Sequence, residues 1–92
     1  MRKAMELGID LEVGAAYVRY GDRGARGTSI RLSEDVVVHY DTDNHVAGIE
    51  LIEVRLDAIR AAEAFASQNG LIFPVLDRYA RDASGHAMDA SR

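Results

Sequence analysis

Residues 35–54 read DVVVHYDTDNHVAGIELIEV, and this stretch decides the fold. A valine-rich run comes first, a turn of Asp, Asn and His follows, and a second apolar run carries Gly48, Ile49 and Glu50. β-Branched and aromatic residues suit a pleated, half-buried surface, whereas Asp and Asn favour turns. The stretch therefore predicts a β-hairpin at the centre of a small antiparallel sheet.

The rest of the chain extends this hairpin on both sides. Apolar and polar residues alternate in three earlier segments, and the period becomes helical after Val54, where alanines accumulate up to a stop at Gly70. Residues 71–73 then run extended into Pro74, since the residue before proline avoids the helical region. The predicted strands are 5–12, 16–20, 28–32, 36–41 and 47–54, the main helix is 55–69, and a short helix is expected within 75–81.

These elements predict an α+β fold, a small antiparallel β-meander of about five strands followed by one main helix and a short C-terminal segment. Residues 1–81 form a single domain in this prediction, because 92 residues leave no room for two cores. Residues 21–27, GDRGARG, are expected to form a loop. The small, polar residues 82–92 are expected to be a disordered tail.

Composition excludes several classes of function. The chain has no cysteine, which rules out disulfides, thiolate metal sites and a cysteine nucleophile. It has neither the apolar run of a signal peptide nor one long enough to span a membrane, so we expect a cytoplasmic protein. The net charge of −4 argues against nucleic-acid binding, which needs cations to neutralise phosphates.

The charges are also unevenly distributed along the chain. Residues 19–31 carry four arginines against one aspartate, and residues 34–57 carry seven acidic residues against one arginine. Two solvated faces explain this pattern. The alternative explanation is self-complementarity, in which a basic loop of one copy meets an acidic edge of another.

Three motifs resemble those of a family of small bacterial proteins catalogued only as a domain of unknown function. The motifs are DLEVGAAYVR at 10–19, VVVHYDTD at 36–43 and GIE at 48–50, and the resembling part covers about half the chain. The resemblance implies a small antiparallel β-meander with an appended helix and no established activity. Because some relatives are similar to proteins encoded beside small toxins, it also suggests an antitoxin-like or partner-binding role. This chain departs from the pattern where Asn44 or His45 replaces a turn glycine, and at the inserted residues 21–27. Its signature positions are Asp41, Asp43, Gly48, Ile49 and Glu50.

One cluster contains residue types that bind metals, namely His39, Asp41, Asp43 and His45. Alternate residues of a strand share a face, and histidine with carboxylate suits Zn²⁺ or Fe²⁺. The competing interpretation is turn chemistry, in which Asp and Asn side chains bond their own backbone. We expect turn chemistry, no bound metal and no cofactor.

Glu50 is the second candidate, because it stands between Ile49 and Leu51 in an apolar strand. If buried, its carboxyl would have a raised pKa and could act as an acid or base. If it faces solvent, Arg19 or Arg31 is the expected partner. The serines lack a nucleophile elbow, so no catalytic residue is predicted.

These observations favour a non-enzymatic domain that acts through self-association or a protein partner. A homodimer is expected, with Leu71, Ile72, Phe73 and Leu76 as its interface, because so short a chain buries a limited core. The alternative is a small metal- or ligand-dependent enzyme using His39, Asp41 and Glu50.

Overall fold

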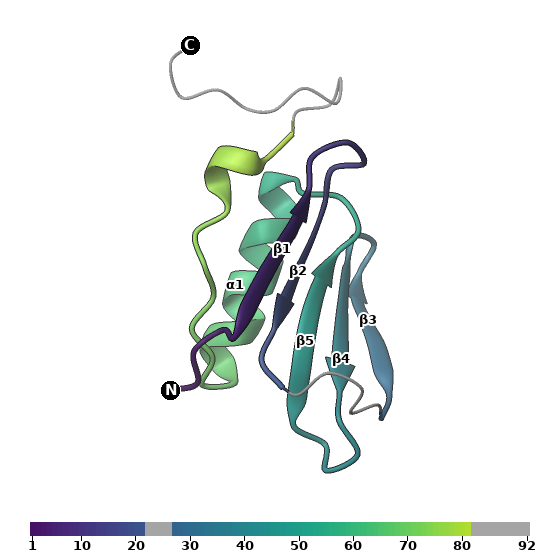
Figure 1. Ribbon diagram of the computed structural model, residues 1–92, viewed down its shortest axis with the longest axis vertical. Helices are drawn as coiled ribbons and strands as arrows, with labels where there is room; N and C mark the ends of the chain where they lie inside the picture. Colours follow the sequence, from purple (N-terminus) through teal and green to yellow (C-terminus); the bar gives the residue numbers. More distant parts are fainter. Residues whose placement is uncertain (22–26, 82–92) are drawn as a thin grey trace.

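The computed structural model describes residues 1–21 and 27–81, which form one antiparallel sheet with a helix and an extended segment on one of its faces (Figure 1). The sheet has five strands in the order β1-β2-β5-β4-β3. Their bounds are Glu6–Asp10 for β1, Ala15–Arg19 for β2, Ser29–Ser33 for β3, Val36–Tyr40 for β4 and Val46–Leu51 for β5. The predicted α+β fold of five antiparallel strands and one helix is confirmed.

The strand order differs from the predicted five-stranded meander, because β2 pairs with β5 rather than with β3. Strands β3, β4 and β5 form a meander, β1 and β2 form a hairpin, and β5 pairs with both β2 and β4. β5 is therefore the central strand, and four of its six residues are buried in succession. The predicted loop at 21–27 lies between β2 and β3, and its residues 22–26 fall outside the described part of the chain.

Helix α1 (Leu56–Gln68) covers the centre of the sheet. Asp57 stands in its first turn, where a negative charge interacts favourably with the helix dipole. Its buried face consists of small and branched residues at helical spacing, Ala58, Ile59, Ala62 and Ala66. The helix ends at Asn69, and Gly70 follows with a φ of 68°, a conformation that favours glycine.

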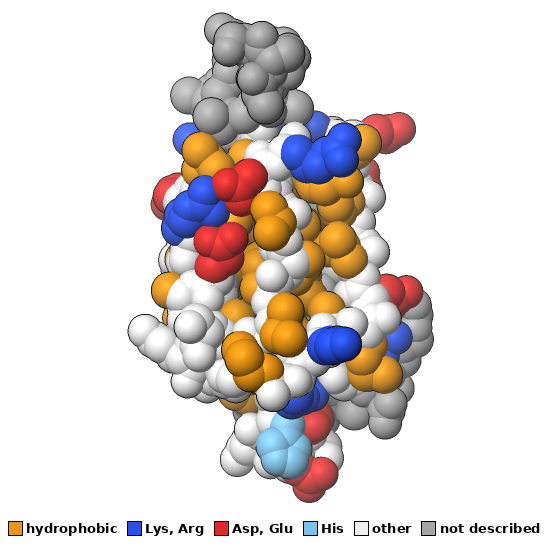
Figure 2. Space-filling view, turned by 90° about the vertical axis from the view of Figure 1, so that its left-hand side faces the viewer, with side chains coloured by type: hydrophobic (Ala, Val, Ile, Leu, Met, Phe, Trp, Pro, Cys, Tyr) orange, Lys and Arg blue, Asp and Glu red, His pale blue; other side chains and the backbone are white. Residues whose placement is uncertain are grey.

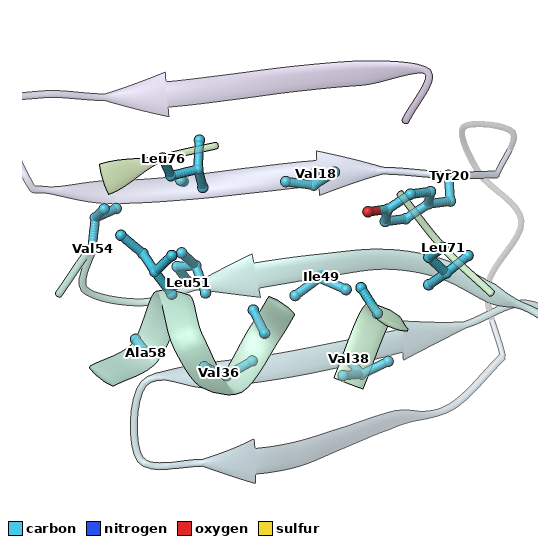
Figure 3. Close-up of a cluster of buried hydrophobic side chains, with 14 of the residues drawn as sticks. Val18, Tyr20, Val36, Val38, Ile49, Leu51, Val54, Ala58, Leu71 and Leu76 are labelled. Atoms are coloured by element: carbon cyan, nitrogen blue, oxygen red, sulfur yellow. The ribbon is translucent and has the colours of Figure 1, made fainter. Parts of the chain in front are cut away.

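The core lies between this helix and the inner face of the sheet. Figure 3 shows side chains from β2, β4 and β5 pointing toward α1, together with side chains from the chain that follows the helix. The largest fully buried side chains are Ile49, Leu51, Ile59, Leu76, Val18, Val36, Val38 and Val54. The central part of the sheet is thus sealed by two elements, of which only one is a helix.

The second covering element is the segment at residues 70–80. A parallel bridge joins Arg2 to Leu71, and the Tyr20 hydroxyl donates a 2.8 Å hydrogen bond to the carbonyl oxygen of Ile72. Leu71 and Leu76 are buried in the core of their own chain. Only the 3₁₀ turn η1 (Asp77–Tyr79) forms where a short helix was expected.

This packing corrects the predicted dimer interface. Leu71 and Leu76 are 2% and 0% exposed, so they are not available to a second copy. Phe73 is partly buried against the core, and only Ile72 of the four remains exposed. The prediction was wrong for the two leucines because α1 packs mainly on β4 and β5, and the segment at residues 70–80 completes the core with Leu71 and Leu76. The predicted tail, residues 82–92, lies outside the described residues.

Within 1–21 and 27–81, no helix has the length and apolar character to cross a membrane.

Candidate functional site

The face of the sheet opposite α1 carries two of the polar side chains that the sequence singles out, His39 and Glu50. The strand register places Glu50 opposite both Tyr17 and Val37. In the next row, Gly48 lies opposite Arg19 and His39, and His39 lies opposite Ser29. We call this set the open-face cluster: Tyr17, Ser29, His39, Gly48 and Glu50.

A hydrogen-bonded chain runs across this cluster. His39 Nε2 lies 2.9 Å from Glu50 Oε1, and His39 Nδ1 lies 2.7 Å from Ser29 Oγ. An ionised carboxylate only accepts hydrogen bonds, so Nε2 carries the proton and donates to Glu50. In neutral His39 the Nδ1 lone pair then accepts the hydroxyl proton of Ser29. Ser29, His39 and Glu50 thus stand in the order of a nucleophile, its general base and the carboxylate that orients the base, on a solvent-accessible face of the sheet.

Gly48 gives this cluster its shape. A Cβ at residue 48 would overlap the phenol oxygen and the adjoining ring atoms of Tyr17, so the phenol end of this ring lies directly against the glycine backbone. From there it also meets His39, with 5.9 Å between ring centroids and an interplanar angle of 45°. The Gly-Ile-Glu signature therefore has a local physical reading in this chain. Gly48 admits the ring, Ile49 fills the core, and Glu50 holds His39.

A shallow depression of about 500 Å³ lies beside the cluster. It forms because small residues of β1 and β2 leave space next to the Tyr17 ring and the Glu50 carboxylate. Its lining is Gly8, Ile9, Asp10, Ala15, Ala16, Tyr17 and Glu50.

The side chain of Glu50 is 43% accessible. Of the two alternatives for Glu50, buried or facing solvent, the structure therefore has the second. The partner of Glu50, however, differs from the two arginines expected. Arg19 bonds Glu6 at 3.0 Å, and Arg31 donates to the carbonyl oxygen of Glu34. His39 takes their place because Gly48 opposite it has no side chain, which lets the imidazole lean toward the diagonal neighbour Glu50.

The four candidate metal-binding residues divide into two groups. Asp41, Asp43 and His45 lie in the β4–β5 turn, with one possible ligand atom from each within 4.8 Å of the others. His39 does not join them, since it is engaged by Ser29 and Glu50. Within residues 1–21 and 27–81, these three turn residues form the one group that could hold a cation.

Turn chemistry accounts for Asp41 without a cation. Its Oδ1 accepts hydrogen bonds from the backbone N–H groups of Asp43 and His45 at 2.8 and 2.9 Å. The bond from the His45 N–H is the main reason that the pKa of Asp41 lies below its usual value. Asn44 completes the turn with a φ of 63°, which asparagine tolerates well.

Sequence reasoning did not identify Ser29. Its single available signal is alternation, since Ser29 and Arg31 share one face of the predicted strand at 28–32. That face meets His39 only once β3 pairs with β4 in the observed register.

No protein-family model, curated protein or solved structure matches this chain. The resemblance to a bacterial family of unknown function therefore stays a prediction.

Proposed function

We propose that this chain is a small non-enzymatic cytoplasmic domain that acts by association, first of all with a second copy of itself. The observation that carries the proposal is the edge strand β3. All five of its residues are exposed, and Ile30 and Leu32 are 54% and 41% accessible. Ile30 lies opposite Val38, a core residue, so its side chain points to the helix side of the sheet. Apolar residues in such positions mark interaction surfaces.

The extent of the covering layer explains this exposure. α1 packs on β4 and β5, and the segment after it reaches the core beside β2. Neither element shields Ile30 or Leu32 at the far edge. A partner that lies against β3 would cover both.

A second exposed apolar surface lies on the segment itself. Figure 2 shows hydrophobic side chains gathered along the side of the molecule where this segment runs, with charged groups around them. Ile72 and Val75 of the segment are 44% and 77% accessible. An antitoxin-like role requires a protein partner of a different kind. Such a partner could bind this second surface while β3 is occupied by another copy.

The experiment is a mass measurement in solution by light scattering at micromolar concentration. The proposal expects twice the chain mass of 10.1 kDa. The double variant Ile30→Asp, Leu32→Asp should return the monomer mass, whereas Val75→Asp, a charge placed on the other exposed surface, should leave the dimer intact. A wild-type mass of about one chain rejects self-association.

The open-face cluster favours a second candidate function, hydrolysis of activated esters. Ser29 Oγ would attack the ester carbonyl carbon while His39 Nδ1 takes its proton and returns it to the departing alcohol. Water would then cleave the acyl-serine by the same route and release the acid. Asp41, which belonged to the enzymatic alternative, has no part here because it is held in the turn.

The test is 4-nitrophenyl acetate turnover, corrected for the buffer rate. This candidate expects His39→Ala and Ser29→Ala each to abolish the excess rate, while His45→Ala, which removes an exposed histidine from the turn, retains it. Equal rates in all three variants would mean that nonspecific hydrolysis by exposed imidazoles accounts for the excess rate, and this outcome would reject the candidate.

A further inference from the structure

We infer that the second copy joins the sheet at β3 in antiparallel orientation, with Ile30 of one copy directly opposite the partner's Ile30. The inference rests on the proposed self-association and specifies its geometry. The result would be a continuous sheet of two copies about a twofold axis, the commonest symmetry of soluble homo-oligomers.

The first step is the direction of the β3 backbone. The Tyr40 N–H donates to the Thr28 carbonyl at 2.7 Å, and the Gly27 N–H donates to the Tyr40 carbonyl at 2.9 Å. Backbone bonding alternates along an antiparallel pair, so Ile30 is the next residue to bond β4. Ser29 and Arg31 therefore turn their N–H and C=O groups toward the outer edge. A row of this kind is a template for another strand.

The second step is the choice of edge, since β1 is also outermost in the sheet. β1 has glycine at its centre, which weakens a strand, and it carries Glu6 and Asp10 on the same face as Gly8. Pairing two copies about Gly8 would place Glu6 against the partner's Asp10, a like-charge contact. β3 has no glycine, and it carries Ile30 and Leu32 on either side of its central Arg31. Joining β1 of one copy to β3 of the next would give an open filament rather than a closed dimer.

The third step is the register. Twofold pairing that keeps inner residues opposite inner residues, and that pairs at least three residues of β3 with β3 of the partner, is centred on residue 30, 31 or 32. A centre at Arg31 brings two guanidinium groups together, and a centre at Leu32 places Ile30 against the partner's Glu34. A centre at Ile30 places Arg31 against the partner's Ser29 and Leu32 against the partner's Thr28. It is the one register of the three without a charged mismatch.

An irregularity within β3 supports the same choice. The register of β3 against β4 shifts between Arg31 and Ser33, so Leu32 sits at a bulge. A bulge bends its strand and interrupts pairing at that point. Regular pairing with a second strand is therefore best centred on the N-terminal half of β3, at Ile30.

Single cysteines test this register, because the chain has none of its own. Ile30 opposite its copy would be a non-hydrogen-bonded pair, with Cα atoms about 4.5 Å apart, which suits a disulfide. Under mild oxidation, Ile30→Cys should form a disulfide-linked dimer at least ten times faster than Leu32→Cys or Val75→Cys. Ile30 is half-exposed, so the substitution leaves the core intact.

A proline variant tests the backbone pairing separately. The Arg31 N–H points outward in this geometry, so Arg31→Pro should keep the fold but yield a monomer, because proline cannot donate to the partner. Arg31→Ala, the matched control, loses the same side chain and should remain a dimer. Circular dichroism reports whether each variant is folded.

The outcomes separate this inference from the proposed function. A wild-type monomer overturns both. A wild-type dimer in which Leu32→Cys cross-links fastest, or in which folded Arg31→Pro remains dimeric, overturns the β3 geometry and leaves self-association standing. A dimer that cross-links at Ile30 and is lost in Arg31→Pro supports both.

Discussion

The ring of Tyr17 lies over Gly48 so closely that any side chain at residue 48 would occupy its place. This contact orients the open-face cluster, because the same ring tilts against His39. A residue without a side chain thus fixes the position of the largest side chain in the cluster.

Gly48→Ala should destabilise the domain by about 1–3 kcal/mol, the usual cost of inserting atoms into a packed site. Urea unfolding measures the change. Gly8→Ala is the matched control on the same face, since a Cβ there meets nothing within 4 Å, and it should change stability little. Adding Tyr17→Ala to Gly48→Ala should recover part of the loss. A Gly48→Ala variant as stable as the wild type would contradict the steric account.

His39 should exist at neutral pH as the tautomer with the proton on Nε2, because Glu50 accepts from that nitrogen. Long-range ¹H–¹⁵N correlation spectra distinguish the two ring nitrogens. Glu50→Ala should remove the preference while lowering stability by only about 0–1 kcal/mol, as is usual for exposed pairs. Finding the proton on Nδ1 in the wild type would reject the chain from Ser29 to Glu50.

Alkaline pH should weaken the fold through Tyr20. Burial raises the pKa of Tyr20 to about 12, against an ordinary 10.0. The folded state therefore holds its phenol proton more tightly, so this stabilisation is complete below pH 10 and is lost as the pH rises toward 12. Absorbance at 295 nm should show a tyrosine ionising near pH 12. Tyr20→Phe should lack that step, and a titration unchanged by this substitution would contradict the assignment.

Leu76→Ala should cost about 2–5 kcal/mol, because Leu76 is fully buried in the core of its own chain. Its neighbour Val75 is 77% exposed, and Val75→Ala should stay within about 0.5 kcal/mol of the wild type. Thermal unfolding at several protein concentrations measures both. A Leu76→Ala defect that vanishes at high concentration would return Leu76 to a dimer interface.

The β4–β5 turn should depend on Asp41 more than on its neighbours. Asp41→Ala removes the acceptor of two backbone N–H groups, whereas Asp43→Ala and His45→Ala remove side chains that hold no such bonds in the turn. The melting temperature should fall most for Asp41→Ala. Asp41→Asn should retain most of the stability, since its amide oxygen accepts the same bonds. Equal effects of all three alanine substitutions would favour a shared role such as metal binding.

The elements of the fold follow from local pattern, whereas their order in space does not. Alternation in β4 and β5 and the alanine-rich period of α1 depend on neighbours along the chain, and their positions were predicted within a few residues. That β5 pairs with β2 depends on which strand edges meet after the hairpins have formed. Nothing in either strand alone encodes it.

The candidate site shows the same division. The turn bonds of Asp41 were predicted, because an aspartate side chain reaches only its own turn. The partner of Glu50 was not predicted, because it depends on how β4 and β5 are aligned. The register of these strands shifts between His39 and Tyr40, and this shift brings Gly48 opposite His39. A single residue of shift decides which side chains meet.

The bridge between Arg2 and Leu71 sets a condition on how the protein is made. The backbone N–H of Arg2 donates to the Gly70 carbonyl, and the Arg2 carbonyl accepts from the Ile72 N–H. These hydrogen bonds can form only after residues 70–72 have been synthesised. β2 likewise can pair with β5 only after β5 has been synthesised, and the core is complete only when Leu76 and Ala80 are present. During synthesis on a ribosome, nearly the whole domain must therefore leave the exit tunnel before its native packing is available. Until then the apolar face of the early β1–β2 hairpin remains uncovered, which makes this hairpin prone to aggregation during synthesis.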